Sequence, residues 1–166
     1  MSPTFTQSDF VLTHLDGYVG SITDPYIQSR YTGFVAVTAV TAFETNIRSK
    51  IFDFCQKKHS VFGAFAQSHF AKTNAKVKTQ QLQDEYLAKF GPRYLSRFKK
   101  KMNILEENHL RTEGTSLKGS FNNLVQWRHD FVHDGVLPAF ATYADARKAY
   151  DSGKLVVATF FDCLVR

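Results

Sequence analysis

A proline-free segment from Tyr26 to Lys58 constrains the fold of this chain most strongly, because a series of its positions is spaced three or four residues apart. Those positions are Phe34, Val37, Thr41, Glu44, Ile47, Ile51 and Phe54. This spacing follows one face of an α-helix. Asp24 and Pro25 immediately precede the segment and are residue types typical of an N-cap and a first helical position. The pattern predicts one long helix to about Lys58, with Gly33 as a point at which it can bend.

Further helices are predicted along the rest of the chain, joined by short polar connections. The expected helices are 60–71, 80–90, 94–107, one capped by Ser116 or Ser120 that ends at His133, and a last one from the Thr142 cap through Phe160 with a break at Ser152–Gly153. The expected loops are 72–78 and 111–115. Because the sequence has no strand-like alternation and no internal repeat, it predicts an all-α bundle of about five or six antiparallel helices.

The N-terminal residues differ from the rest of the chain. Residues 1–23 carry scattered glycine, serine, threonine and aspartate and no sustained hydrophobic period. We expect them to form an irregular arm that precedes a helical domain at 24–166.

The composition is that of a globular and moderately basic chain. Its 166 residues can bury one core, and the net charge of +6 favours a polyanionic partner such as nucleic acid. Its two cysteines are too few for a disulfide framework or a cysteine zinc site. The first residues lack the pattern of a secretory signal, and the longest apolar stretch, 155–161, is far shorter than a membrane span. We therefore expect a soluble, cytoplasmic protein without a membrane partner.

The segment RHDFVH, residues 128–133, places an arginine and two histidines at the end of a predicted helix. Gly135 and Pro138 follow at positions typical of a helix C-cap and of the chain just beyond it. Arg128 and His133 differ by about 140° around a helix axis, so one helix does not aim both at the same atom. Two copies of this helix packed against each other would bring both pairs into one cleft. The geometry therefore suggests a dimeric site.

Such a site is suited to the cleavage of RNA by its own 2′-hydroxyl group. A histidine near its ordinary pKa of about 6.5 exchanges protons at neutral pH. An arginine binds a phosphate through two parallel hydrogen bonds and stabilises the charge that develops on its oxygens. This route requires no metal. The alternative is that Arg128 is an ordinary surface residue and that His133 only supports the last carbonyls of its helix.

Metal chemistry is a second alternative for the same segment. His129 and His133 lie one turn apart, as in metal-binding helices, and with Asp130 they form H-D-x-x-H, whose acid is one methylene shorter than that of the zinc-protease H-E-x-x-H. The other histidines of the chain lie in no motif that would supply a third ligand. The adjacent His129 and Asp130 also fit an HD-type metal phosphohydrolase, but upstream histidines in helical register are lacking. We therefore expect no metal site and no cofactor.

A basic cluster and a single tryptophan are further candidates for contact with RNA. The cluster lies in and just before the predicted helix 94–107 and consists of Arg93, Arg97, Lys99, Lys100 and Lys101. Such a cluster either follows a phosphate backbone or is a solvated helix face. Trp127 is placed to stack on a base, although a lone tryptophan in a helix more often belongs to a core or a dimer interface.

The chain resembles the HEPN superfamily. Its residues 128–133 are similar to the R-x4-6-H motif, with a polar residue after the arginine, and they lie late in an all-α bundle with one more helix to follow. Within the superfamily the chain is most similar to the RiboL-PSP branch and to related bacterial stand-alone proteins. The similarity to this branch lies in the Asp24–Pro25 helix start, in Glu44 within that helix, and in LAKFGPRYLSRF at 87–98. It extends over roughly residues 24–164.

The resemblance implies a metal-independent endoribonuclease of the toxin or phage-defence type that acts as a homodimer and leaves a 2′,3′-cyclic phosphate and a 5′-hydroxyl. It implies that His133 is the acid/base and that Arg128 is the phosphate clamp. It also implies that His129 orients this pair or contacts RNA and that Glu44 is a more distant supporting residue. The implied partners are RNA and an antitoxin or other regulatory protein.

Two features set limits on what the resemblance implies. In the subgroup paired with minimal nucleotidyltransferase antitoxins, a tyrosine lies two positions after the histidine, and here that position is Gly135. Control through modification of this tyrosine is therefore not expected. Some HEPN proteins lack nuclease activity and bind RNA, nucleotide or a protein partner, and a non-catalytic module of that kind is the alternative function.

Overall fold

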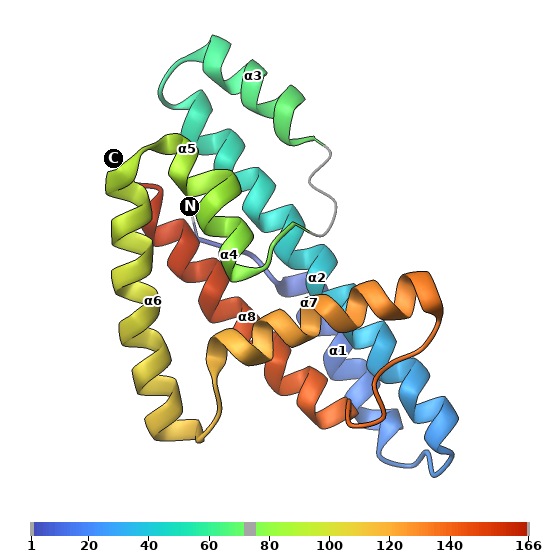
Figure 1. Cartoon of the computed structure of the whole chain (residues 1–166). Coiled ribbons are helices and arrows are strands. Elements are labelled where there is room, and N and C mark those ends of the chain that lie inside the picture. Colours follow the sequence, from blue (N-terminus) through green and yellow to red (C-terminus); the bar gives the residue numbers. More distant parts are fainter. Residues whose placement is uncertain (1, 72–75, 166) are drawn as a thin grey trace.

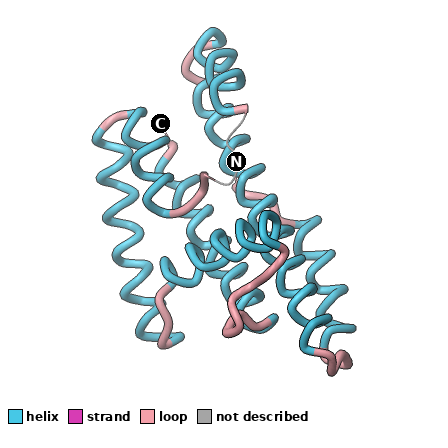
Figure 2. The backbone as a smooth tube through the Cα atoms, turned by 45° about the vertical axis from the view of Figure 1, so that its right-hand side comes forward, coloured by secondary structure: helices cyan, strands magenta, loops and turns pink. Residues whose placement is uncertain are grey.

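The computed structural model describes residues 2–71 and 76–165, and every regular element within them is helical (Figure 1). The predicted all-α class is confirmed. Figure 2 shows the helices as closely packed segments joined by short loops. Over the same residues no helix is both long enough and apolar enough to cross a membrane.

The long predicted helix is α2 (Pro25–Gln56), and it forms the spine of the bundle. The Asp24 side chain accepts hydrogen bonds from the backbone N–H groups of Tyr26 (2.8 Å) and Ile27 (3.4 Å), as an N-cap does. The buried positions of α2 include Val35, Ala39 and Phe43, which lie in the core of the molecule. Helices α3, α7 and α8 all pack against this spine.

The remaining helices follow the predicted order with shifted boundaries. They are α3 (Ser60–Phe70), α4 (Thr79–Gln81), the π-helical segment η1 (Leu82–Leu87), α5 (Ala88–Phe90), α6 (Pro92–Glu113), α7 (Leu117–Asp134) and α8 (Tyr143–Cys163). The predicted helix 80–90 is thus interrupted by a π-helical turn. Helix α6 continues to Gly114, which ends it with φ 68°, so the predicted loop 111–115 is partly helical. Of the predicted loop 72–78, residues 72–75 lie outside the described residues.

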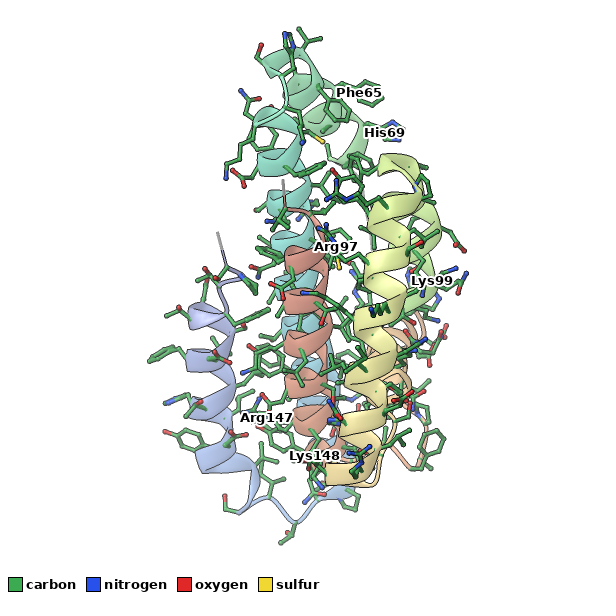
Figure 3. The ribbon with its side chains drawn as sticks, turned by 90° about the vertical axis from the view of Figure 1, so that its left-hand side faces the viewer. Phe65, His69, Arg97, Lys99, Arg147 and Lys148 are labelled. Carbon is green, nitrogen blue, oxygen red and sulfur yellow. The ribbon has the colours of Figure 1, made fainter. Side chains whose placement is uncertain are left out.

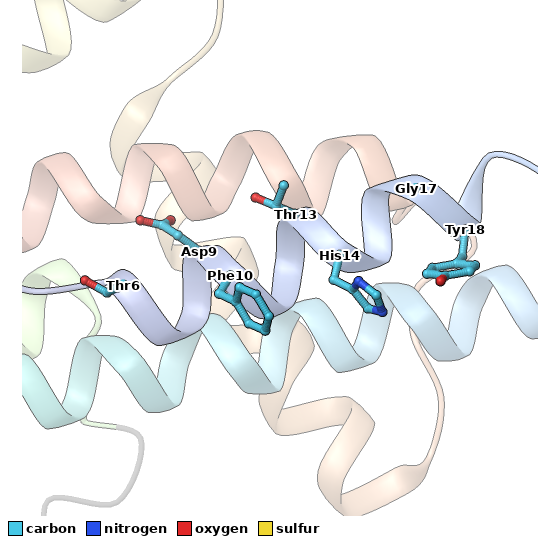
Figure 4. Close-up of a pocket in the computed structure, with 7 residues that line it drawn as sticks. All are labelled: Thr6, Asp9, Phe10, Thr13, His14, Gly17 and Tyr18. Carbon is cyan, nitrogen blue, oxygen red and sulfur yellow. The ribbon is translucent and has the colours of Figure 1, made fainter.

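The prediction of an irregular N-terminal arm is wrong, because residues Thr6–Val19 form helix α1. This helix buries few apolar side chains, chiefly Leu12 and Val19, and therefore lacks a strong sequence period. Contacts with distant residues hold it in place, including an ion pair of 3.0 Å between Asp9 and Lys154 on α8. Figure 4 shows Asp9 on the side of α1 toward α8 and Phe10 and His14 on its outer side.

The predicted break in the last helix is also wrong, because α8 runs without interruption through Ser152 and Gly153. At Gly153 the backbone of α8 approaches the core so closely that an added Cβ would overlap the Phe43 ring and touch Phe121. The glycine therefore allows three helices to meet, and it does not mark a helix end. Its weak helix propensity is offset by this packing.

Helix α7 lies across α2 and α8 (Figure 1). Its two ends are capped as the sequence predicts. The Ser116 hydroxyl accepts a hydrogen bond of 2.9 Å from the backbone N–H of Gly119. Gly135 adopts the left-handed conformation, with φ 70°, and its N–H donates to the Phe131 carbonyl at 3.1 Å. The RHDFVH segment thus forms the last turns of a helix whose C-terminal end lies beside the first half of α2.

Candidate functional site

The last two turns of α7 present different side chains to α2 and to solvent. Phe131 is half-buried against Gly33 of α2, where an added Cβ would overlap its ring. Arg128 lies one turn earlier on the same side and is also half-buried, whereas His129 and His133 are exposed. Gly33 therefore provides a seat for Phe131, and this contact fixes which face of α7 carries the arginine and which carries the histidines.

The two histidines form a pair on the outer face of α7. Their ring centroids are 4.4 Å apart with an interplanar angle of 47°. This is the arrangement expected for residues one turn apart on a helix. His129 is therefore placed to influence the orientation of the His133 imidazole, which has no hydrogen bond to any other described residue.

The charge of Arg128 is not neutralised by an ion pair with any described residue. Its Nε atom is buried and has no hydrogen-bond partner among the described residues, and these residues also provide no carboxylate in an ion pair with it. A half-buried guanidinium without a partner is energetically unfavourable, since buried donors cost about 1–3 kcal/mol when they are left unpaired. The Nη1 and Nη2 atoms of Arg128 likewise make no hydrogen bond or ion pair with any described residue, and these atoms are suited to bind an anionic ligand.

The Asp130 carboxylate forms no ion pair with Arg128, and it binds Gln126 of the same helix. The Gln126 amide donates to its carboxylate at 2.6 Å, and the Lys78 ammonium donates to the Gln126 carbonyl oxygen at 2.7 Å. The described residues contain no group of three or more histidine, cysteine or acidic side chains arranged to hold a metal ion. Either metal alternative would need a third ligand beside His129 and His133. Residues 2–71 and 76–165 provide none in the required arrangement.

An arginine that the sequence analysis did not identify contacts the end of α7. Arg30 of α2 donates a hydrogen bond of 2.6 Å from Nη1 to the carbonyl oxygen of Gly135. Its guanidinium carbon lies 5.6 Å from the centroid of the Phe131 ring. The two residues joined by the hydrogen bond are 105 positions apart in the chain, so no local pattern reveals this contact.

Glu44 does not lie beside the RHDFVH segment. It is half-buried on α2, next to the core residue Phe43 and about 16 Å along the helix axis from the Gly33 seat. Its supporting role remains a prediction.

The basic cluster divides into two sets on α6. Arg97 donates to the Cys163 carbonyl at 3.2 Å and Lys101 forms a 3.0 Å ion pair with Asp162, so both tie α6 to the end of α8. The side chains of Arg93, Lys99 and Lys100 are exposed. Figure 3 shows Arg97 on the side of α6 toward α8 and Lys99 on the outer side. The second set is free of these contacts, and Lys101 is exposed as well as paired, so all four side chains are accessible to a phosphate backbone.

Trp127 lies in the core and is only 6% exposed. Its ring makes an edge contact with Phe140, with centroids 6.5 Å apart. A buried ring does not present a face on which a base can stack, so the position of Trp127 does not fit the predicted stacking role. Its burial agrees with the alternative role in a core.

Comparison with known families agrees with this arrangement of helices. The model of the RiboL-PSP-HEPN family matches residues 11–166, which is most of the chain. The chain belongs to the RiboL-PSP-HEPN family. The family match confirms the resemblance to the HEPN superfamily and extends it from residue 24 back into α1. No curated protein and no solved structure matches the chain.

Membership of the RiboL-PSP-HEPN family supports an RNA-related role for the protein. The net charge of +6 and the exposed basic side chains of α6 are consistent with a polyanionic partner. The RHDFVH segment lies late in the bundle, with α8 as the one helix after it. Its place in the fold is therefore the one that the sequence predicts for it.

Proposed function

We propose that this RiboL-PSP-HEPN protein is a metal-independent endoribonuclease in which Arg128 binds the scissile phosphate and His133 transfers protons. The observation that carries the proposal is the half-buried side chain of Arg128, whose guanidinium makes no hydrogen bond or ion pair with any described residue. A paired arginine would have a structural explanation, and this one lacks it. The exposed His129 and His133 rings lie on the same two turns of α7.

The chemistry follows from the ordinary properties of these side chains. A neutral imidazole takes the proton of the 2′-hydroxyl as its oxygen attacks phosphorus. The bond between phosphorus and the 5′ oxygen breaks, and a protonated imidazole gives its proton to that leaving oxygen. The products are a 2′,3′-cyclic phosphate and a 5′-hydroxyl. Arg128 stabilises the negative charge on the phosphate oxygens in the transition state.

The site is proposed to be completed by a second copy of the chain. Arg128 and His133 point about 140° apart on one helix, so a base, an acid and a clamp around one phosphate are more readily supplied by two α7 helices. Exposed apolar side chains surround the end of α7: Tyr26 is 65% exposed, Val132 50% and Val136 60%. We expect Val132→Asp to reduce both self-association in sedimentation experiments and RNA cleavage, because it places a charge at this interface.

The biological setting proposed for this activity is that of a toxin or phage-defence effector. An unregulated ribonuclease damages its own cell, so an antitoxin or another regulatory protein is the expected partner. The supporting residues are proposed to be His129, which contacts the His133 ring, and Glu44. The exposed Arg93, Lys99 and Lys100 are proposed to guide the RNA backbone.

The decisive experiment is cleavage of mixed cellular RNA by the wild type, Arg128→Ala and His133→Ala, each with and without EDTA. We expect cutting by the wild type that EDTA does not change and that both substitutions abolish, with cyclic phosphate at the new 3′ ends. His14→Ala on α1 is the matched control, because His14 is exposed like His133, distant in sequence from the RHDFVH segment, and outside the proposed site. Cutting that survives both substitutions would overturn the assignment of the site.

A non-catalytic RNA-binding module is the second candidate. The exposed Arg93, Lys99 and Lys100 favour it, since binding alone needs only a basic surface. A folded, dimeric wild type that binds RNA with strong salt dependence and never cuts it would support this candidate. In that case Arg93→Ala would weaken binding and Arg128→Ala would have little effect.

A further inference from the structure

The C-terminal turn of α7 is held against α2 by contacts that converge on one side chain, that of Arg30. Its Nη1 donates to the Gly135 carbonyl at 2.6 Å. Its guanidinium carbon lies 4.5 Å from the Tyr26 ring centroid and 5.6 Å from that of Phe131. Two aromatic rings and one carbonyl therefore restrict the guanidinium, and its buried Nε makes no hydrogen bond with any described residue.

These contacts act at the part of α7 that would otherwise be least ordered. The last carbonyls of a helix have no partner within the helix, and its final turn frays when they find none elsewhere. Arg30 acts one residue further on: its charge-assisted hydrogen bond holds the carbonyl of the capping residue Gly135, and a cation is favourable at a helix C-terminus. Arg30 therefore stabilises the left-handed turn at Gly135, where α7 ends.

His133 depends on this turn for its direction. It lies two residues before Gly135, it is exposed, and its side chain makes one ring contact, with His129 of the same helix. Its imidazole makes no hydrogen bond, ion pair or ring contact with a side chain of another described element. The orientation of the ring is consequently set by the backbone of the last turn of α7, which Arg30 and the Gly33 seat fix to α2.

We propose that Arg30 is a positioning residue of the ribonuclease site, which acts on His133 through the Gly135 carbonyl and does not touch RNA. This inference rests on the proposed function for its kinetic consequence. Its structural content is independent of that function, because it states that α2 determines the order of the last turn of α7.

The test compares Arg30→Met and Arg30→Lys with a matched control on the same helix. Arg48 of α2 also donates from Nη1 to a backbone carbonyl, that of Ala71 at the C-terminal end of α3, at 3.3 Å. Arg48→Met therefore removes the same type of contact at a different helix end. Each variant is assayed for kcat and KM on a short RNA, and for amide hydrogen exchange of residues 131–135.

We expect Arg30→Met to lower kcat by about tenfold or more with KM nearly unchanged, because small misplacements of a reacting group are costly in rate. Amide exchange in 131–135 should accelerate by about tenfold. Arg30→Lys, which keeps a cationic donor, should recover most of kcat. Arg48→Met should leave kcat and the exchange of α7 unchanged.

Three outcomes would overturn the proposal. The first is a kcat of Arg30→Met equal to that of Arg48→Met. The second is an increase in KM alone, which would mean that Arg30 binds RNA directly. The third is unchanged exchange at residues 131–135 in Arg30→Met. A wild type that cuts no RNA would instead refute the proposed function, and the exchange measurement would still decide whether Arg30 orders the end of α7.

Discussion

Two regions of the molecule each contain an arginine with one buried nitrogen that has no partner among the described residues, yet their surroundings differ. Arg147 lies between α8 and α1 and binds Asp16 through two of its nitrogens, with Nε at 2.9 Å from Oδ1 and Nη2 at 3.0 Å from Oδ2. Tyr143 donates to the same carboxylate at 2.7 Å. Arg128 at the end of α7 has no such carboxylate within the described part of the chain.

The presence or absence of a carboxylate partner distinguishes a structural arginine from one that is available to a ligand. The charge of Arg147 is neutralised inside the fold, and its hydrogen bonds join an N-terminal helix to a C-terminal one. The charge of Arg128 is held half-buried by packing and is left for a ligand. A charged group that the fold does not neutralise is a better indicator of function than a charged group in an ion pair.

The largest expected effect is on the rate of RNA cleavage by Arg128→Ala. If Arg128 stabilises the transition state, its loss should lower the rate by about a thousandfold, which corresponds to roughly 4 kcal/mol. The free energy of unfolding should change little or rise, because an unpaired charge is removed. Cleavage is measured on a short RNA and unfolding in urea. A variant that loses stability and keeps its cleavage rate would make Arg128 a structural residue like Arg147.

The next effect is expected for Gly33→Ala, which fills the seat of Phe131. The added Cβ would overlap the Phe131 ring, and overpacking of this kind costs about 1–3 kcal/mol of stability. Cleavage should fall as well, because α7 must shift on α2. Gly17→Ala in α1 is the control: nothing lies within 4 Å of its Cβ position, and alanine should stabilise that helix by about 0.5–1 kcal/mol. Equal thermal unfolding of the two variants would contradict the seat.

The sequence predicts the parts of the fold that depend on local chemistry. The Asp24 cap, the Thr142 cap and the left-handed Gly135 all occur where the residue types require them. Helix α1 and the continuity of α8 at Gly153 were missed because distant residues determine them. An ion pair with Lys154 and the close approach of Phe43 leave no periodic signal in the segments that they stabilise.

The same division applies to the candidate site. The sequence predicts that the RHDFVH segment ends a helix, and the contact between His129 and His133 follows from their spacing of one turn. The half-burial of Arg128 and the contact of Arg30 with Gly135 depend on how α2 and α7 cross. The burial of Trp127 could not be predicted from its place beside Arg128 in the sequence, because burial depends on how α7 packs in the bundle.

A smaller effect is expected for Arg147→Met, which removes the ion pair between Arg147 and Asp16. The Asp16 carboxylate is 40% exposed, so solvent screening limits the loss to about 1 kcal/mol of unfolding free energy. The rate of RNA cleavage should remain that of the wild type. Unfolding in urea gives the first quantity and the short-RNA assay gives the second. A large loss of cleavage would show that the contact between α1 and α8 supports the site.

The smallest effect is the dependence of stability on acidic pH. Burial alone would raise the pKa of Asp16, but hydrogen bonds from Arg147 and Tyr143 and the charge of Arg147 outweigh it and hold the pKa below its ordinary value of 3.8. The same balance, with Lys154 and Tyr150 as donors, lowers the pKa of Asp9. The stability that these groups contribute is therefore complete above the ordinary pKa and is lost as the pH falls through the lowered one.

Urea unfolding between about pH 6 and pH 3 tests this sign. Stability should be nearly flat in the upper part of this range and fall in the lower part, by less than about 1 kcal/mol for each carboxylate after solvent screening. Asp16→Asn should reduce that fall. Arg128→Ala should leave it unchanged, because no described carboxylate is paired with Arg128. If Arg128→Ala also reduced the loss of unfolding free energy at acidic pH, Arg128 would have a carboxylate partner in solution. The contrast with Arg147 would then disappear.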